Sequence, residues 1–410
     1  MELARSVEAE IQGILLRIRS IQAGNQLKVL AAFQAARISP FHFAETTGYG
    51  LDDPGRAALE DVFRRVFGTE AALVRPGIVS GTHAIALCLF GILRPGDRLV
   101  SLTGRPYDTL LGVIGPGTPG SLAHLGVEYR EGSCLVDGRP DGALLARLLD
   151  APADTRVLAF IQRSGGYGPG PGVDPRQAGE LARLAAAIRP GTVTLVDNCY
   201  GEFTELQEPT ETGASLVAGS LIKNPGGGLA PAGGYVAGPR ELVELAAVRL
   251  TAPGLGSAVG ASPPGARLLF QGLYLAPTMV GTALANAVFA ARFFERLGLP
   301  TRPAWNHPRT DIVQEITLGS RPQVLAFLRG IQQSSPVDAA AAPEPGPLPG
   351  YADPVAMAAG TFVQGATLEL SADSPLRPPF NVYLQGGLVR EQASLACMLA
   401  AQEMGLGGPA

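Results

Sequence analysis

The segment from Gly191 to Gly238 constrains the fold of this chain more than any other. It contains three short apolar runs with the length and composition of buried strands, at residues 192–196, 214–218 and 235–237. Asp197 follows the first run, and Ser220 and Lys223 follow the second. Neighbouring parallel strands end at the same edge of a sheet. The segment therefore predicts a carboxylate and an amine brought together at adjacent strand ends.

Lys223 stands out because the sequence contains only two lysines, Lys28 and Lys223, among 32 basic residues. Arginine stays protonated and cannot form an imine, whereas a desolvated lysine can lose its proton and attack an aldehyde. A lysine kept in a chain that otherwise uses arginine favours a role that arginine cannot perform. The alternative is a lone surface lysine in a loop. With Asp197 facing a pyridine nitrogen, the pair fits a pyridoxal phosphate (PLP) site.

Composition narrows the class of protein. The chain has 410 residues, 46% of them hydrophobic, which is enough for a large core and two domains. The net charge is −4 and no basic block is present, so nucleic acid is not an expected partner. The N-terminus has no signal-peptide core, and no uncharged apolar stretch approaches the ~18 residues of a membrane span. We therefore expect neither secretion nor a membrane segment.

The four cysteines are widely spaced, at positions 88, 134, 199 and 397. None forms a CxxC pair, so neither a zinc site nor a disulfide scaffold is expected. A reducing, cytoplasmic location follows from this usage. Cys199 reads as a small core residue rather than a nucleophile.

Strand and helix patterns alternate through about residue 250. Helical spacing of apolar residues predicts helices at residues 1–37, 54–67, 84–93, 174–188, 282–297, 323–333 and 389–404. Apolar runs predict strands at residues 98–102, 157–162, 192–196, 214–218, 235–237, 312–318, 367–371 and 382–385. Residues 163–172 and 251–278 read as loops, and residues 335–354 as a long proline-rich connection. The order predicts an α/β protein with a large, doubly wound, mainly parallel sheet and a smaller C-terminal α/β domain.

Residues 76–83 open one of these helices with a run of small residues. Ser80 or Thr82 can cap the helix, and the free backbone N–H groups with the positive end of the helix dipole suit a phosphate group. The alternative is an ordinary capped helix without a ligand.

Six segments, spread over about residues 40 to 400, resemble the fold-type-I PLP enzymes. They are GYGLDDPGR, VSGTHA, VDNCYGEF, GSLIKNPGGGLAPAGGY, QGLYLAP and ELSADSPLRPPFNVYLQGG. Together they are similar to the methionine gamma-lyase-like family of aluminium-resistance proteins. The segment around Lys223 is long and specific. The resemblance implies the fold-type-I PLP-dependent transferase fold, with a helical arm at 1–45, a large PLP-binding domain at 46–285 and a small C-terminal domain at 286–410.

The resemblance also implies roles at the cofactor. Lys223 would hold PLP and then move the substrate's α-proton, and Asp197 would keep the pyridine nitrogen protonated. A turn aspartate at a strand end is the alternative for Asp197. The residues that would bind the phosphate are Ser80, Gly81, Thr82 and Ser220. Related enzymes carry a second hydroxyl directly before the lysine, where this chain has Ile222.

Aromatic residues have two implied roles. Tyr107 or His83 would stack on the cofactor ring, and Tyr107 is preferred because it follows strand 98–102. For both, the alternative is a half-buried side chain without a ligand. Tyr49 and Arg56 resemble the tyrosine and arginine that transsulfuration enzymes send to the phosphate of a neighbouring subunit, although their spacing differs. They imply a homodimer or homotetramer with a shared active site.

The carboxylate of an amino-acid substrate calls for an arginine, whose planar fork matches two oxygens. Arg377 is the preferred candidate, with Arg390 and Arg163 as alternates, and each has a solvated surface arginine as its alternative.

We therefore expect a cytoplasmic, PLP-dependent carbon-sulfur lyase of the methionine gamma-lyase or cystathionine lyase type. It would act on a sulfur-containing amino acid by α-proton abstraction and β- or γ-elimination. The alternatives are another PLP enzyme (an aldolase, γ-synthase or aminotransferase) or a PLP-binding stress-tolerance protein with little catalysis.

Overall fold

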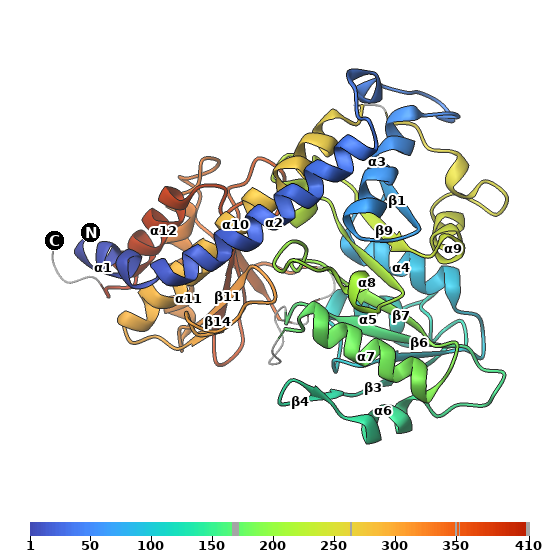
Figure 1. The fold of residues 1–410 in the computed structure, drawn as a ribbon. Helices are drawn as coiled ribbons and strands as arrows, with labels where there is room; N and C mark the ends of the chain where they lie inside the picture. The colour runs from blue at the N-terminus through green and yellow to red at the C-terminus, as the bar shows by residue number, and fades with distance from the viewer. Residues whose placement is uncertain (166–171, 263–264, 349–350, 352, 407–410) are drawn as a thin grey trace.

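The chain folds into two α/β units that a pair of long helices spans (Figure 1). The computed structural model describes residues 1–165, 172–262, 265–348, 351 and 353–406. The middle of the predicted loop at 163–172 and part of the proline-rich connection lie outside the described residues. The larger unit holds a seven-stranded sheet and the smaller one a five-stranded sheet.

The seven-stranded sheet has the order β1-β9-β8-β7-β6-β2-β3. Its strands are β1 (Ala71–Arg75), β2 (Arg98–Ser101), β3 (Glu128–Glu131), β6 (Val157–Gln162), β7 (Val193–Asp197), β8 (Leu216–Ser220) and β9 (Gly234–Gly238). Neighbours from β8 through β7, β6 and β2 to β3 pair in parallel, and β9 is antiparallel to β1 and β8. This arrangement confirms the predicted mainly parallel sheet.

Both faces of this sheet are covered, which is why its strands are apolar throughout. Side chains alternate across a strand. In β6, Leu158 and Phe160 join the core cluster that includes α4 and α9, whereas Ala159 and Ile161 join the cluster that includes α3 and α7. The helices of this unit are α3 (Pro54–Val66), α4 (Gly81–Ile92), α5 (Asp108–Ile114), α6 (Gly142–Leu149), α7 (Pro175–Ile188), α8 (Pro209–Thr212) and α9 (Arg240–Leu250). A short hairpin of β4 (Leu135–Val136) and β5 (Arg139–Pro140) precedes α6.

The helix starts follow local chemistry. Asp53 caps α3, because its Oδ1 accepts from the N–H of Arg56 at 2.8 Å. Ser80 caps α4, because its Oγ accepts from the N–H of His83 at 3.0 Å. The start of α4 therefore lies just beyond the carboxyl ends of the central strands, where parallel sheets bind their ligands.

The smaller unit is built on an antiparallel sheet of order β10-β11-β14-β13-β12. Its elements are β10 (Thr301–Arg302), β11 (Val313–Thr317), α11 (Arg321–Gln333), β12 (Val355–Ala358), β13 (Ser371–Pro375), β14 (Asn381–Gln385) and α12 (Arg390–Glu403). The strand predicted at 367–371 is wrong: residues 367–370 form bends and β13 begins at Ser371. Apolar alternation alone did not reveal this shift, because the pairing of β13 with β14 sets its register.

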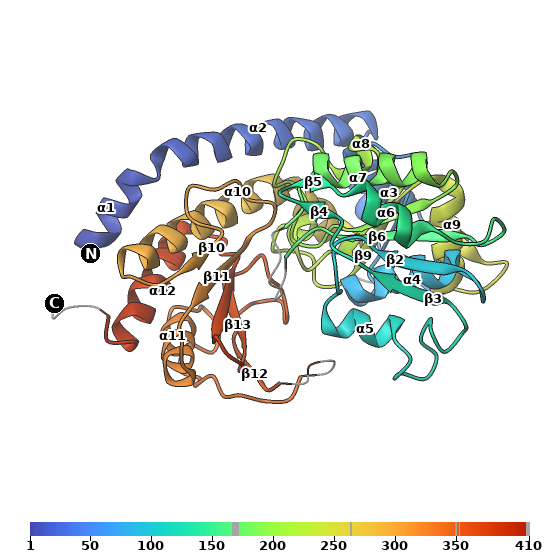
Figure 2. The same cartoon turned by 90° about the horizontal axis from the view of Figure 1, so that it is seen from below.

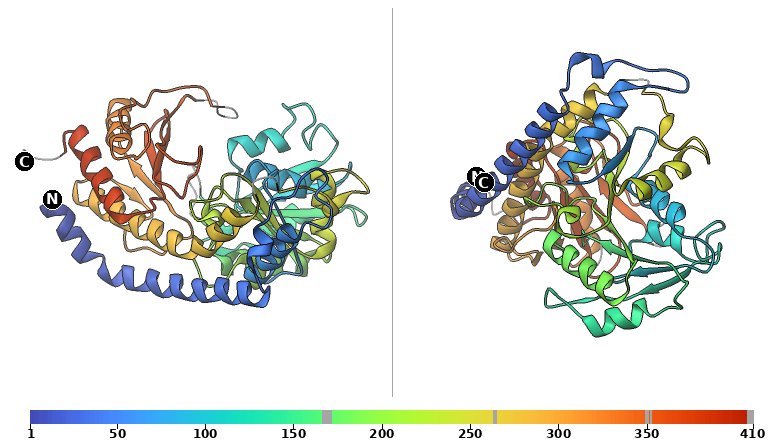
Figure 3. Two further views of the ribbon diagram at one scale, coloured as in Figure 1. Left: turned by 90° about the horizontal axis from the view of Figure 1, so that it is seen from above. Right: turned by 45° about the vertical axis from the view of Figure 1, so that its right-hand side comes forward.

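Two long helices run side by side from the smaller unit to the larger one (Figure 2). They are α2 (Gln12–Ala35), which continues the short α1 (Glu2–Glu10), and α10 (Arg267–Arg296). Both views in Figure 3 show the N-terminal helices lying along α10 of their own chain. Buried residues such as Val7, Ile11 and Leu15 make this contact.

Helix α10 differs from the loop expected at residues 251–278. It begins at Arg267, inside the segment expected to be loop, and it continues through Pro277. It spans residues 285 and 286, where the predicted large and small domains meet. By length and composition α10 could cross a membrane, contrary to the expectation that no such stretch exists. However, 72% of its most apolar window is buried inside the protein, as in a core helix. Tertiary packing has overridden the loop signal of Gly272 and Pro277.

Candidate active site

Side chains at the ends of three parallel strands open into one cavity of about 210 Å³. Gln162, Asp197 and Ser220 are the last residues of β6, β7 and β8, and all three line it. We call this side of the cavity its floor. The smaller unit contributes the opposite wall through Val313, Tyr351 and Gln385, which we call the roof. The cavity therefore lies between the two units, at the carboxyl edge of the parallel sheet.

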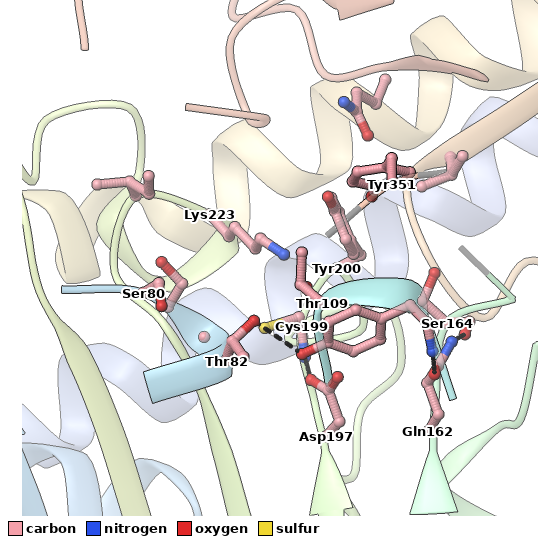
Figure 4. A pocket seen from close by; sticks show the side chains of 16 residues that line it. Ser80, Thr82, Thr109, Gln162, Ser164, Asp197, Cys199, Tyr200, Lys223 and Tyr351 are labelled. Carbon is pink, nitrogen blue, oxygen red and sulfur yellow. Dashed lines mark hydrogen bonds between the residues drawn. The ribbon is translucent and has the colours of Figure 1, made fainter. Parts of the chain in front are cut away.

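Lys223 and Asp197 line the same cavity, as the sequence predicted for adjacent strand ends (Figure 4). Strands β7 and β8 pair in parallel, which brings Asp197 at the end of β7 next to the end of β8, three residues before Lys223. Lys223 Nζ lies 3.8 Å from the centroid of the Tyr200 ring. Asp197 is only 4% exposed, and its Oδ1 accepts from the N–H of Cys199 at 3.1 Å. The site thus holds one amine and one buried carboxylate on a rigid base.

The charges of this pair depend on each other. Burial raises the pKa of Asp197, and the positive charge of Lys223 opposes that rise. Burial by itself would lower the pKa of Lys223, but Cys199, Tyr200 and Asp197 together raise it above its ordinary value. A protonated lysine cannot attack an aldehyde, so bond formation requires loss of this proton. A cation bound beside Asp197 would take over the role of counter-charge.

The start of α4 is closely packed and can bind an anion. A Cβ added to Gly81 would lie 2.6 Å from Cys199 Sγ and 3.7 Å from Ser220 Cβ, so only glycine fits there. The Ser220 Oγ is buried and has no hydrogen-bond partner among the described residues. An unpaired buried hydroxyl beside free helix N–H groups suits a phosphate oxygen. These features fit the PLP phosphate, with Ser80, Gly81, Thr82 and Ser220 available to hold it.

Of the two aromatic candidates for stacking, only Tyr107 lines the cavity. Its hydroxyl lies 3.1 Å from Thr82 Oγ1, and its backbone N–H donates to Gln162 Oε1 at 3.3 Å. The residues lining the cavity do not include His83, whose Nδ1 accepts from the N–H of Val79. Burial raises the pKa of Tyr107, with a further contribution from Asp197, so its hydroxyl stays protonated.

Tyr49 and Arg56 lie outside this cavity. Tyr49 is 77% exposed. Arg56 is buried, and its guanidinium donates to the carbonyls of Gly50, Gly260 and Ala258 at 2.6, 2.6 and 3.1 Å. Within its own chain, Arg56 therefore fastens the loop that carries Tyr49.

Among the described residues, no arginine lines the cavity. Arg377 lies beyond the end of β13, pairs with Asp353 at 3.3 Å and does not line the cavity. The reason is the register: Ser371 pairs with Gln385 beside the cavity, and the chain then leads Arg377 away. The two alternates are also engaged elsewhere. Arg163 donates to Asn198 Oδ1 at 2.8 Å in the core, and Arg390 pairs with Glu8 at 2.7 Å.

Three of the lining residues that sequence reasoning missed are Tyr200, Tyr351 and Gln385. Tyr200 carried a signal, since it lies three positions after the strand-end Asp197. Tyr351 lies in the connection that was conspicuous for its length. Gln385 ends β14, and nothing in its local sequence distinguishes it.

An amine and a buried carboxylate, facing one cavity beside a helix N-terminus in a sheet of this topology, define a fold-type-I PLP enzyme. The methionine gamma-lyase family model matches residues 1–405, and the chain belongs to that family. PLP is its cofactor.

Known proteins agree with this assignment. A solved structure from Listeria monocytogenes, provisionally named a cystathionine beta-lyase involved in aluminium resistance, is 45% identical, with a TM-score of 0.94 over 98% of this chain and 99% of that chain. The L-methionine gamma-lyase of Pseudomonas putida is 30% identical over 275 residues, 67% of this chain and 60% of that enzyme. The PLP-dependent Escherichia coli protein YhfS is 17% identical, with a TM-score of 0.63 over 95% of this chain and 97% of that chain, which shows a shared fold.

Proposed function

We propose that this enzyme is a carbon-sulfur lyase that eliminates a thiol from Cβ or Cγ of a sulfur-containing amino acid. The observation that carries the proposal is the meeting of Lys223 and Asp197 in one cavity with two protonated tyrosines, Tyr107 and Tyr200. Elimination needs a base for the α-proton and an acid for the departing sulfur. The names of the family and of the Listeria relative support a sulfur amino acid as substrate.

Each residue has a distinct task in this proposal. When bound, PLP supplies the electron sink that stabilises the substrate after its α-proton has left. Lys223 Nζ removes that proton and holds it. Asp197 would supply the buried negative charge that keeps the pyridine nitrogen protonated. The start of α4 and Ser220 would hold the phosphate, and Tyr107 would contact the ring.

The test is to incubate the purified enzyme with cystathionine, cysteine and methionine while keto acid and thiol are assayed. We expect both products from at least one substrate and none from Lys223→Ala. The visible spectrum provides the cofactor control, because a band near that of a protonated imine should be present in the wild type and lost in the variant. A spectrum with that band but no product from any of the three substrates would overturn the lyase proposal and leave the cofactor assignment intact.

We further propose a cytoplasmic homodimer or homotetramer, in which Tyr49 reaches the phosphate of the neighbouring subunit. Two exposed apolar side chains support a partner at this place: Tyr49 is 77% exposed, and Val79, directly before the capping Ser80, is 74% exposed. Sedimentation velocity should give at least a dimer, and Tyr49→Ala should weaken PLP binding. A monomer with full activity would contradict this arrangement.

A further inference from the structure

Tyr200 adopts a backbone conformation that side chains rarely take. Its φ is +70°, in the left-handed region, on the turn directly after β7. For a bulky residue this conformation costs about 1–2 kcal/mol, and such residues gather at active sites, where the surroundings impose them. Tyr200 is half-buried and lines the catalytic cavity. The strain therefore serves to aim this ring into the cavity.

The ring lies between the catalytic amine and the roof. Lys223 Nζ is 3.8 Å from the ring centroid, a cation–π distance. Figure 4 shows Tyr200 beside Lys223, with Tyr351 of the roof beyond it. The features that fit the cofactor, Asp197 and the start of α4, belong to the floor. The side chain of a substrate therefore extends toward the roof, past Tyr200.

Tyr107 is placed differently from Tyr200. The hydroxyl of Tyr107 is engaged with Thr82 at the start of α4, on the phosphate side of the cavity. Burial raises the pKa of Tyr200, although the charge of Lys223 opposes it, so its phenol carries a proton at neutral pH. Tyr200 is thus a proton donor held against the amine that receives the α-proton.

We propose that Tyr200 protonates the departing sulfur and is then reprotonated by Lys223. This inference rests on the proposed lyase function. For a leaving group at Cβ, Lys223 takes the α-proton, and the electron pair of that bond becomes the second bond between Cα and Cβ. The pair of the breaking Cβ–S bond stays on sulfur, which takes the proton of Tyr200 Oη and leaves as a thiol. The ammonium of Lys223 then returns its proton to the phenolate, so protons and electrons balance.

Tyr200→Phe tests the hydroxyl alone, since the ring is kept. The variant should be compared on L-cystathionine, whose thiolate needs a proton to leave readily, and on β-chloro-L-alanine, whose chloride needs none. We expect kcat/KM to fall about 10²–10⁴-fold for cystathionine, the usual contribution of a general acid, and to change little for chloroalanine. Tyr274→Phe, which changes an exposed tyrosine on α10, is the matched control. Equal losses on both substrates, or no loss on either, would overturn the proposal.

A second measurement needs no turnover and therefore separates this inference from the lyase proposal. In the cofactor-free protein, an amine-reactive label should modify Lys223 with a pH profile that reports its pKa. Lys28, the other lysine of the chain, is the internal reference. Removing the ring in Tyr200→Leu should raise labelling of Lys223 at neutral pH by about 2- to 30-fold, the range of a cation–π contact. Tyr200→Phe keeps the ring and loses only the contribution of the hydroxyl, so it should raise labelling less. An unchanged profile in Tyr200→Leu would show that the ring does not hold the amine.

Discussion

The floor and the roof of the cavity are built by different means. The floor residues end parallel strands whose register is fixed by backbone pairing, with Gln162 opposite Asp197 and Asp197 opposite Ala218. The roof residues come from an antiparallel sheet and a connection far along the chain: Val313, Tyr351 and Gln385. The floor is therefore positioned by hydrogen-bond ladders, and the roof by the packing of one unit on another.

The difference separates two tasks. Bond-making chemistry tolerates little displacement, and the ladders supply the required rigidity. The roof residues are held by packing, so a change in packing can move them, and we expect them to select the substrate. In the roof, Gln385 Nε2 donates to Asp373 Oδ2 at 3.1 Å, so even this residue is held by neighbours in its own sheet.

The largest effect should come from replacing the amine of the floor. Lys223→Arg keeps the positive charge but cannot form an imine, so we expect activity to fall at least about 10³-fold, within the range for loss of a catalytic base. The matched control is Lys28→Arg, which changes a surface lysine paired with Glu211 at 3.0 Å. Keto-acid production and the visible spectrum measure both variants. Retained activity in Lys223→Arg would show that the reaction does not need the amine of Lys223.

A second prediction concerns Glu202, a buried carboxyl that does not line the cavity. Glu202 is fully buried, its Oε1 accepts from the hydroxyl of Tyr235 at 2.8 Å, and burial raises its pKa from 4.5 to about 8. Between these values the folded state holds a proton that the unfolded chain has lost. The free energy of unfolding should therefore fall as pH rises from 4.5 to 8, by up to about 1.4 kcal/mol per pH unit.

Glu202→Gln mimics the protonated carboxyl and should flatten this dependence. Urea unfolding of the cofactor-free protein at pH 5 and pH 8 measures it. An equal slope in the wild type and in the variant would mean that Glu202 ionises at its ordinary pKa.

The tight contact at the start of α4 should give the next effect. In Gly81→Ala, the added Cβ would lie 2.6 Å from Cys199 Sγ, so overpacking should cost about 1–3 kcal/mol and weaken PLP binding. Gly77→Ala is the matched control, because nothing lies within 4 Å of its Cβ position. Urea unfolding and titration with PLP measure the two variants. If they behave alike, the floor is looser than the structure indicates.

The smallest effect should come from the arginine that lies away from the roof. Arg377 makes a half-exposed ion pair with Asp353, so Arg377→Ala should change stability by about 0–1 kcal/mol and leave kcat/KM nearly unchanged. Steady-state kinetics with any accepted amino acid provides the measurement. A large rise in KM shared by all substrates would instead indicate that Arg377 binds the substrate carboxylate.

Sequence reasoning succeeded where the signal was local. Apolar runs located β6, β7 and β8, and Asp197 and Lys223 followed from them. The cap at Ser80 was equally readable, since capping depends on a few adjacent residues. It failed at the start of α10, where buried packing overrides Pro277, and at β13, where pairing with β14 sets the register.

By itself, the sequence determined that a rare lysine and an aspartate stand at the ends of adjacent strands, because the period and polarity of a strand are written in consecutive residues. Only the tertiary structure decided which other side chains meet them. It brought Tyr200, Tyr351 and Gln385 to the cavity and left Arg377 outside. The position of a loop or of a distant sheet depends on long-range packing, which no short stretch of sequence encodes.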